Sequence, residues 1–412
     1  MATAALLVAS SLAGLTTQIS NIDPRYATDG MIMDAHDGNT IQYESEGDFH
    51  YYGMGYGLCQ EDGVQARGLC GQWSNNTVGV WTSPSLASGS WKLEHSFTPA
   101  SSGWPNCTYF RSHAVRRKAA DTTEYVLFLN GQSGKDNKCT ACPDGSKAKC
   151  ILAGTSASPT GPFQFKGVVP LRYTNEGGIG DFDVWVDEAD SSPSGQPAPA
   201  YVMYKRSGAA PTPYQHRMTL ERLDDSYLSV AADHSASAGI FGAPFVEAPA
   251  LFRRGDVYYA LFGECCAFCA HGTGIGVYTA AAPLGPWTFH ENIGCNQTVS
   301  PQCGCGMSVP PALTNGTQCP RAQAVTYAQQ NSVIRVPGGA RVGDQFVWTG
   351  DRWQSACRST CLAQGVPPGP IDLGCVKGWD YQYWSLLSWD ESTTPPLPRQ
   401  VHWQDNFSLS IG

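Results

Sequence analysis

Polar side chains that could carry out acid–base chemistry recur along this sequence, each inside a mostly apolar stretch. The stretches are MDAHDG (33–38), YFRSHAV (109–115), IGDFDVWVD (179–187), FVEAPALF (245–252) and AQQNSVIRV (328–336). A buried strand rarely keeps a carboxylate without a use for it, because an unpaired buried charge is costly. The candidate catalytic residues are therefore Asp34, Asp181 and Glu247. The candidate substrate-binding residues are His36, Arg111, Gln330 and Trp353.

Three carboxylates and an arginine in one narrow site suit the hydrolysis of a glycosidic bond. One protonated acid donates to the leaving oxygen, and one ionised carboxylate acts on the other face of the sugar. A third carboxylate nearby raises the pKa of the acid by repulsion between like charges. Aromatic side chains such as Trp104, Trp185 and Trp353 are candidates to stack on sugar rings.

Two of the candidate carboxylates have close rivals in the sequence. Asp183 lies two residues after Asp181, on the same face of an extended strand. Asp37 competes with Asp34, although Asp37 directly precedes a glycine and could simply cap a turn. We predict Asp181 and Asp34 as the functional residues of these two pairs.

The remaining candidates also have structural interpretations. His36 could contact substrate, bind a central ion or be a satisfied core histidine, and the buried amide of Gln330 could only tie one strand to its neighbour. Trp353 could belong to the core, and Glu247 could form a structural ion pair. For Glu247 we favour the catalytic interpretation, because an acidic residue before Ala-Pro in an apolar strand needs a partner or a function.

A repeat positions these residues. A polar turn followed by an aromatic–aliphatic strand occurs at 47–55, 123–131, 198–208, 255–263 and 343–351. A second strand ending in a small-residue turn and an aromatic follows at 79–91, 152–163 and 276–287. Each unit has the length of one four-stranded sheet, and such sheets bury their faces by stacking radially. We predict an all-β, five-bladed β-propeller with disulfide-rich loop insertions; a β-sandwich would need closer strand spacing.

Composition supports a turn-rich all-β protein. The 412 residues include 45 Gly and 28 Pro, only 15% are charged and 11% are aromatic. The net charge of -9 and the lack of a basic run argue against nucleic acid and anionic membranes as partners. We expect a monomer that acts on a polysaccharide or oligosaccharide.

The cysteines indicate an oxidising compartment. There are 16 Cys, and N-x-Ser/Thr sequons start at Asn75, Asn106, Asn296, Asn315 and Asn406. The opening MATAALLVASSLAG resembles the apolar core of a signal peptide. We expect a secreted protein with a signal peptide at 1–19 and one domain at 20–412. Cysteines and a histidine at 265–271 resemble metal ligands, but adjacent cysteines favour disulfides. No cofactor is expected, and a structural calcium ion is left open.

The quoted motifs resemble glycoside hydrolase family 43 from about Asp29 to Trp403, and the exo-β-1,3-galactanase-like subfamily in particular. VEAPALFRRGDVYYALF (246–262) is similar to the segment that carries the family's general acid, which implies that role for Glu247. GDFDVWVDEAD (180–190) is similar to the segment with the pKa-modulating aspartate, which implies that role for Asp181. MDAHDG resembles the opening strand and implies Asp34 as general base. The family inverts the anomeric centre, which implies acid and base carboxyls about 6.5–9.5 Å apart.

Two departures accompany the resemblance. Galactanase-type members use a glutamine of the last blade, and this chain has both Gln330 and Asp34, of which Asp34 is the stronger base. Where those members have a glutamate before the blade-two arginine, this chain has Phe110, which leaves the galactan specificity open. The leading hypothesis is a secreted glycosidase acting on galactan-like polysaccharide, or on arabinan or xylan. A non-catalytic glycan-binding propeller and an invertase-like glycosidase are the alternatives.

Overall fold

A computed structural model describes most of the chain. The described residues are 15–45, 47–60, 76–134, 138–142, 149–173, 179–188, 195–206, 217–242, 246–264, 272–296, 324–338 and 343–412. The apolar segment 1–14, the sequons at Asn75 and Asn315, and the cysteine-rich segment 265–271 lie outside them. No helix among the described residues is long and apolar enough to cross a membrane.

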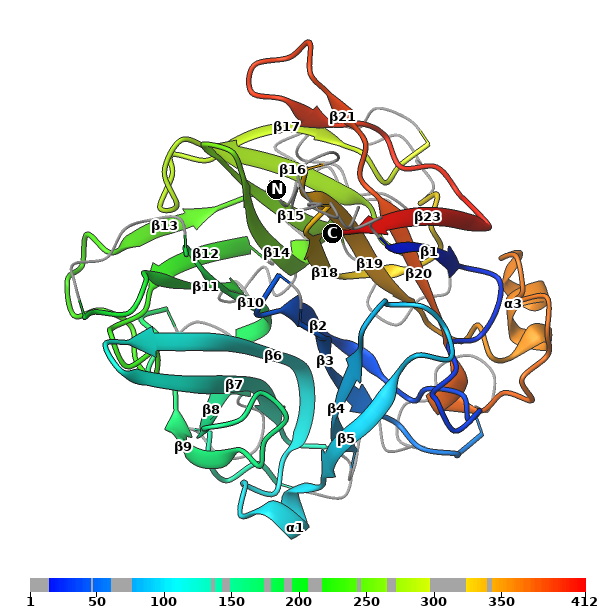
Figure 1. The fold of residues 1–412 in the computed structure, drawn as a ribbon, viewed down its shortest axis with the longest axis horizontal. Helices are drawn as coiled ribbons and strands as arrows, with labels where there is room; N and C mark the ends of the chain where they lie inside the picture. Colours follow the sequence, from blue (N-terminus) through cyan, green and yellow to red (C-terminus); the bar gives the residue numbers. More distant parts are fainter. Residues whose placement is uncertain are drawn as a thin grey trace, which may run out of the picture.

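The described chain is all-β and consists mainly of antiparallel meanders (Figure 1). The first comprises β2 (His36–Gln42), β3 (Phe49–Gly55), β4 (Thr77–Ser83) and β5 (Lys92–Phe97). The second comprises β6 (Thr108–Ala119), β7 (Thr122–Gln132), β8 (Lys149–Ser156) and β9 (Gln164–Val168). A parallel bridge between Gly38 and Ser112 joins these two meanders into one eight-stranded sheet.

The other meanders form separate sheets. The third comprises β10 (Ile179–Val186), β11 (Ala200–Arg206), β12 (Arg217–Arg222) and β13 (Ser237–Phe241). The fourth comprises β14 (Val246–Arg254), β15 (Val257–Glu264), β16 (Ile275–Ala280) and β17 (Thr288–Asn292). A three-stranded sheet comprises β18 (Gln329–Val336), β19 (Gln345–Arg352) and β20 (Tyr381–Leu386).

The repeated sequence patterns occupy equivalent positions in these meanders. The five aromatic–aliphatic stretches form β3, β7, β11, β15 and β19, the second strand each time. The three Ser/Pro/Ala-ended stretches form β4, β8 and β16, the third strand. The polar stretches upstream contain the first strands, as the repeat predicts.

The first strands lie at the centre of the molecule and contact one another in a closed cycle (Figure 1). The contacting pairs are β2 with β6, β6 with β10, β10 with β14, β14 with β18 and β18 with β2. Polar groups on all five strands therefore face a common centre.

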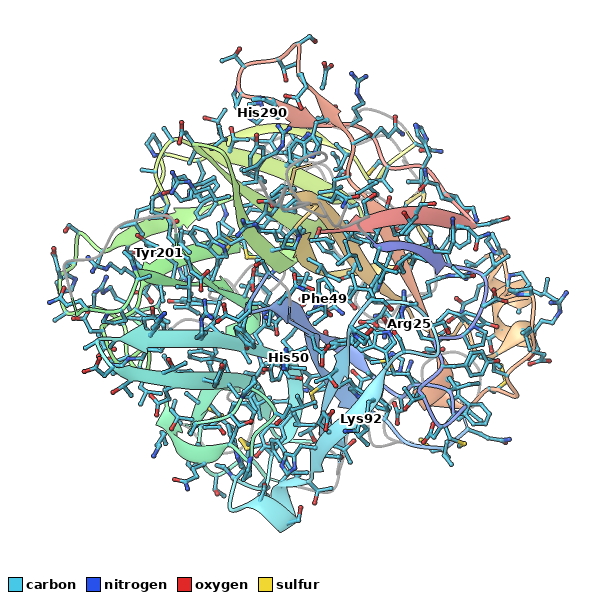
Figure 2. The ribbon with its side chains drawn as sticks, viewed as in Figure 1. Arg25, Phe49, His50, Lys92, Tyr201 and His290 are labelled. Carbon is cyan, nitrogen blue, oxygen red and sulfur yellow. A yellow bond between two sulfur atoms is a disulfide. The ribbon has the colours of Figure 1, made fainter. Side chains whose placement is uncertain are left out.

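Hydrophobic clusters hold neighbouring meanders together around this cycle. One cluster joins the first and second meanders through residues such as Met54, Val80 and Leu129. Other clusters join the second to the third, the third to the fourth and the fourth to the last sheet. A cluster that includes Trp384 and Phe49, of which Phe49 is labelled in Figure 2, joins the last sheet to the first. Inner strands such as β3 and β15 are buried on both faces because each meander packs against two neighbours.

The chain ends meet beside the last sheet. β1 (Leu15–Ser20) pairs in antiparallel fashion with β23 (Asn406–Ile411) along its whole length. Residues within the 1–19 segment therefore form a strand, while the signal-peptide boundary stays a prediction. The short pair β21 (Trp389–Asp390) and β22 (Leu397–Pro398) completes the strands.

Helices are short, and disulfides tie down loops. The helices are α1 (Pro99–Ser102), α3 (Arg358–Gln364) and the 3₁₀ turn Lys377–Trp379. The described disulfides are Cys107–Cys139, Cys142–Cys150 and Cys357–Cys375. They confirm the predicted disulfide-bonded loops for these six cysteines.

Candidate active site

Each of the five central strands departs from regular pairing at the same level. The register shifts lie at His36/Asn39, Phe110/His113, Ile179/Phe182, Glu247/Pro249 and Gln330/Val333. Such β-bulges redirect side chains, and they are common beside active sites. The sequence predicted polar residues at an equivalent point of each unit. The structure has a β-bulge in the first strand at each of these points.

Three bulge residues have left-handed backbone conformations although none is glycine. The φ angles are 57° at Asp37, 52° at Arg111 and 48° at Ala248. Residues with side chains rarely adopt such angles, and strained positions of this kind concentrate at functional sites. Gly38 meets a different requirement, because a Cβ there would lie 1.7 Å from the carbonyl oxygen of Tyr52.

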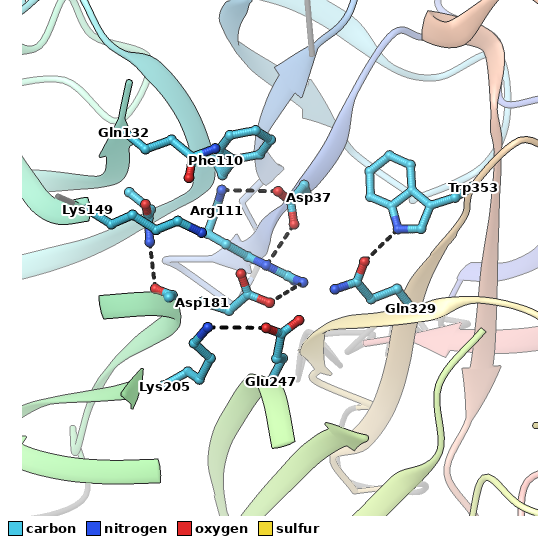
Figure 3. Close-up of a pocket in the computed structure, with 12 residues that line it drawn as sticks. Asp37, Phe110, Arg111, Gln132, Lys149, Asp181, Lys205, Glu247, Gln329 and Trp353 are labelled. Carbon is cyan, nitrogen blue, oxygen red and sulfur yellow. Dashed lines mark hydrogen bonds and ion pairs between the residues drawn. The ribbon is translucent and has the colours of Figure 1, made fainter. Parts of the chain in front are cut away.

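A pocket opens where the bulges converge (Figure 3). Its lining combines three carboxylates and three cationic side chains with amides and aromatics. The lining residues are Asp37, Phe110, Arg111, Asn130, Gln132, Lys149, Gly180, Asp181, Lys205, Glu247, Gln329 and Trp353.

Arg111 organises one side of the pocket. Its Nε lies 2.7 Å from Asp37 Oδ1, and its Nη2 lies 3.1 Å from Asp181 Oδ2. Its Nη1 donates to Asn331 Oδ1 at 2.8 Å. Burial disfavours the guanidinium charge, but the carboxylates of Asp181 and Asp37 outweigh that effect, so the pKa of Arg111 is raised. The planar fork of arginine allows one side chain to hold all three partners.

Asp37 is a buried carboxylate at the pocket wall. Its backbone N–H donates to Asp351 Oδ2 at 2.9 Å, which ties the bulge to β19. Burial raises the pKa of Asp37 to about 8; the charge of Arg111 opposes this shift, and the carboxylates of Asp181 and Asp351 add to it. A carboxyl group with this pKa can release or accept a proton near neutral pH.

Glu247 and Asp181 lie on neighbouring strands. Lys205 Nζ lies 3.3 Å from Glu247 Oε1. Asp181 Oδ2, besides its contact with Arg111, accepts a hydrogen bond from the backbone N–H of Ala248 at 3.2 Å. The residue after Glu247 is thus anchored to Asp181, so the two acidic residues are positioned together by the β14 bulge.

The structure brings together four of the seven predicted site residues. Asp181, Glu247, Arg111 and Trp353 all line the pocket. The indole of Trp353 donates to Gln329 Oε1 at 2.7 Å and is only 2% exposed, so Trp353 forms a wall that is also part of the core.

Asp34, the predicted base, lies outside the pocket lining. Its carboxylate oxygens accept hydrogen bonds from the backbone N–H groups of Tyr56 at 2.9 Å and Gly57 at 2.7 Å. The residue of this segment that lines the pocket is Asp37, the rival of Asp34 in the sequence. The bulge that begins after His36 explains the difference, because it redirects the side chains that follow.

His36 and Gln330 are also outside the pocket lining. The His36 ring is fully buried, with Nδ1 3.4 Å from Asp351 Oδ1 and Nε2 3.6 Å from Asp34 Oδ1. The amide of Gln330 donates to the carbonyls of Ala248 and of Leu261, and its oxygen accepts from the indole of Trp348 at 3.0 Å. Both side chains therefore bind neighbouring segments together and do not line the pocket. This is the structural role that the sequence analysis gave as an alternative for each residue.

Sequence reasoning missed several pocket residues. Lys149 on β8, Lys205 on β11, and Asn130 and Gln132 on β7 come from second and third strands. The candidate site residues predicted from the sequence lie mostly on or beside first strands. A useful signal was present in the second-strand repeat, where a lysine at 205 stands in an otherwise apolar run.

No protein-family model matches this sequence, and no curated protein matches it in sequence. Solved structures of glycoside hydrolase family 43, which are β-propellers, nevertheless share its fold. A family 43 β-1,3-galactosidase matches with a TM-score of 0.59 and 18% identity, covering 96% of this chain and 64% of its own. An exo-β-1,3-galactanase from Phanerochaete chrysosporium with β-1,3-galactotriose matches with a TM-score of 0.60 and 17% identity, covering 96% and 69%.

An exo-β-1,3-galactanase from Clostridium thermocellum has a TM-score of 0.57 and 16% identity, covering 90% of this chain and 63% of its own. The chain therefore spans about two thirds of the length of these structures. At these identities the similarity establishes the β-propeller fold, which the sequence motifs predicted.

Proposed function

We propose that this protein is a glycoside hydrolase that cleaves a galactan-like polysaccharide by an inverting acid/base mechanism. The observation that carries the proposal is the pocket at the centre of the strand cycle, where Asp37, Asp181 and Glu247 surround Arg111. An inverting glycosidase needs one carboxyl as acid and a second as base for water. Three carboxylates on three different strands provide both, with one group to spare.

We assign Glu247 as the general acid and Asp37 as the general base. Asp181 holds the Glu247 segment through the Ala248 N–H and adds negative charge beside the acid. Asp37 replaces Asp34 in the base role, because Asp37 lines the pocket and Asp34 is engaged elsewhere. Arg111 orients Asp37 and Asp181 by contacting both. The positive charge that develops on the sugar in the transition state would lie between these groups.

The galactan preference rests on the neighbours in structure. The family 43 structures include galactanases and a galactosidase, one of them with β-1,3-galactotriose. Arabinan and xylan remain in the proposal because Phe110 lines this pocket beside Arg111. An apolar ring there provides a stacking surface and no charged contact to a hydroxyl.

We further interpret the meanders as five blades of one propeller domain within residues 20–412. The cyclic contacts of the first strands and the hydrophobic clusters between neighbouring meanders support this count. Three described disulfides support a secreted, oxidised protein, and we propose that it acts as a monomer.

Purified protein and its Glu247→Gln variant, incubated with galactan, arabinan and xylan, test this function. The variant keeps the shape of the side chain but cannot donate a proton, so we expect release of sugar to fall about 10²–10⁴-fold. Glu391→Gln, at an exposed ion pair with Arg254, is the matched control and should keep full activity. Binding of a glycan without any release of sugar from the unaltered protein would favour a non-catalytic glycan-binding propeller instead.

A further inference from the structure

One of the three cationic side chains that line the pocket has no ion-pair partner among the described residues. Arg111 pairs with two of the three carboxylates, Asp37 and Asp181, and Lys205 pairs with the third, Glu247. Lys149 lines the same pocket, and within the described ranges it forms no ion pair. The Lys149 residue is exposed overall, but its side chain extends along the pocket wall (Figure 3).

The two lysines are close enough to repel each other. Burial of the ammonium group lowers the pKa of Lys149, and the charge of Lys205 lowers it further, although Glu247 and Asp181 oppose this. Two like charges beside one cavity are unfavourable unless an anion neutralises them. Glu247 pairs with Lys205, but no carboxylate in the described part of the chain pairs directly with Lys149, so the side of the pocket formed by β8 and β11 can accept an anion.

The pairing of Lys205 with Glu247 also conflicts with the role of a general acid. An adjacent ammonium stabilises the ionised carboxylate and lowers its tendency to hold a proton. A ligand anion that attracted Lys205 would weaken this effect.

The side-chain oxygen of Asn130, which also lines the pocket, can accept a hydrogen bond from a ligand. Asn130 is only 3% exposed, and its side-chain nitrogen donates to the carbonyl of Gly180. Its Oδ1 has no hydrogen-bond partner among the described residues. A buried acceptor without a partner is costly, and a hydroxyl group of a sugar would satisfy it.

We propose that the pocket binds a sugar that carries an anionic group, with Lys149 and Lys205 on the anion and Asn130 on a hydroxyl. The inference deepens the proposed function by naming the substrate as an acidic residue of a galactan-like glycan. A carboxylate and a sulfate ester present the same charged oxygens to two ammonium groups. The chemistry required is therefore an anionic oxygen group on the sugar ring or its C6.

The test uses methyl β-D-galactoside, methyl β-D-galacturonide and methyl β-D-galactoside 6-sulfate, which differ only at C6. Calorimetric titration of the unaltered protein at low salt should show at least one anionic sugar binding about tenfold or more tightly than the neutral one. The advantage should shrink as NaCl is raised, because salt screens the lysine charges. The better of the two anionic sugars identifies the source of the charge.

Substitutions of single lysines test which side chains cause the preference for an anionic sugar. Lys149→Met and Lys205→Met should each remove most of the anionic preference, while Lys166→Met, at an exposed lysine on β9 outside the pocket, should keep it. If Lys205→Met fails to fold, the salt dependence and Lys149→Met still test the site. Neutral sugar binding as tightly as both anionic sugars overturns the inference, and so does a preference that Lys149→Met leaves intact.

The binding measurement separates this inference from the proposed function. A protein that prefers anionic sugars but hydrolyses no glycan contradicts the enzymatic proposal and supports the anionic site. A protein that hydrolyses neutral galactan while showing no anionic preference supports the enzyme and contradicts the anionic site.

Discussion

The Nε of Arg111 lies 2.7 Å from Asp37 Oδ1, and both residues have left-handed backbone conformations at bulges on adjacent strands. The ion pair thus joins two strained positions, and the Nη2 of the same guanidinium reaches Asp181 on a third strand. Strain of this kind persists only where the surrounding structure holds it. Here the two strained residues place their charged side chains in the same pocket.

We expect removal of the charge of Asp37 and of Asp34 to have different effects on activity. Asp37→Asn should lower kcat/KM about 10²–10⁴-fold, because it removes the proposed base while keeping the side-chain shape. Asp34→Asn should reduce activity far less, because its carboxylate accepts hydrogen bonds from Tyr56 and Gly57 outside the pocket. Steady-state kinetics on the best glycan compare the two. A large loss from Asp34→Asn with little loss from Asp37→Asn would return the base role to Asp34.

The activity should rise with pH through an unusually high midpoint. A general base acts only when it is deprotonated, and burial raises the pKa of Asp37 to about 8. On the rising limb of the pH profile, each pH unit below about 8 should therefore lower the rate about tenfold. Asp351→Asn should move the midpoint to lower pH, because the charge of Asp351 helps to raise the pKa of Asp37. A pH–rate profile with its rising limb near pH 4 would contradict this assignment.

Arg111 should not tolerate replacement by lysine. Arg111→Lys keeps a positive charge but cannot reach Asp37, Asp181 and Asn331 together, so a buried carboxylate is left without its partner. We expect a loss of about 3–5 kcal/mol in the free energy of unfolding, measured by urea denaturation. Arg335→Lys is the control, because Arg335 pairs with Asp344 at an exposed site where an ion pair contributes about 0–1 kcal/mol. Equal effects of the two substitutions would show that the buried cluster has no special role.

His36 should stabilise the fold more strongly in mild acid than in alkali. Burial lowers its pKa, but the hydrogen bond and charge of Asp351 and the charge of Asp34 outweigh burial, so the net pKa is raised above 6.5. A raised folded-state pKa gives a stabilisation that is fully present below pH 6.5 and is lost as the pH rises through the folded-state value. Thermal unfolding of His36→Phe should therefore show a larger decrease in Tm at pH 5 than at pH 9. The exposed His234→Phe is the control, and a Tm difference independent of pH would contradict a charged His36.

The pattern of the sequence was sufficient for the strands and for part of the site. Aromatic–aliphatic runs that recur five times predicted β3, β7, β11, β15 and β19, because such residues suit strands that are buried on both faces. Glu247, Asp181 and Arg111 could be found because each stands in an apolar run at an equivalent point of its repeat.

The tertiary structure decided which neighbouring residue faces the pocket. Successive side chains of a strand point to opposite faces, so an inserted residue reverses the orientation of all that follow. The bulge after His36 selects Asp37 over Asp34, and no local propensity encodes where that bulge lies. Lys149 and Lys205 join the site from strands far apart in sequence, and only the radial packing of the meanders brings their charges to the carboxylates of the first strands.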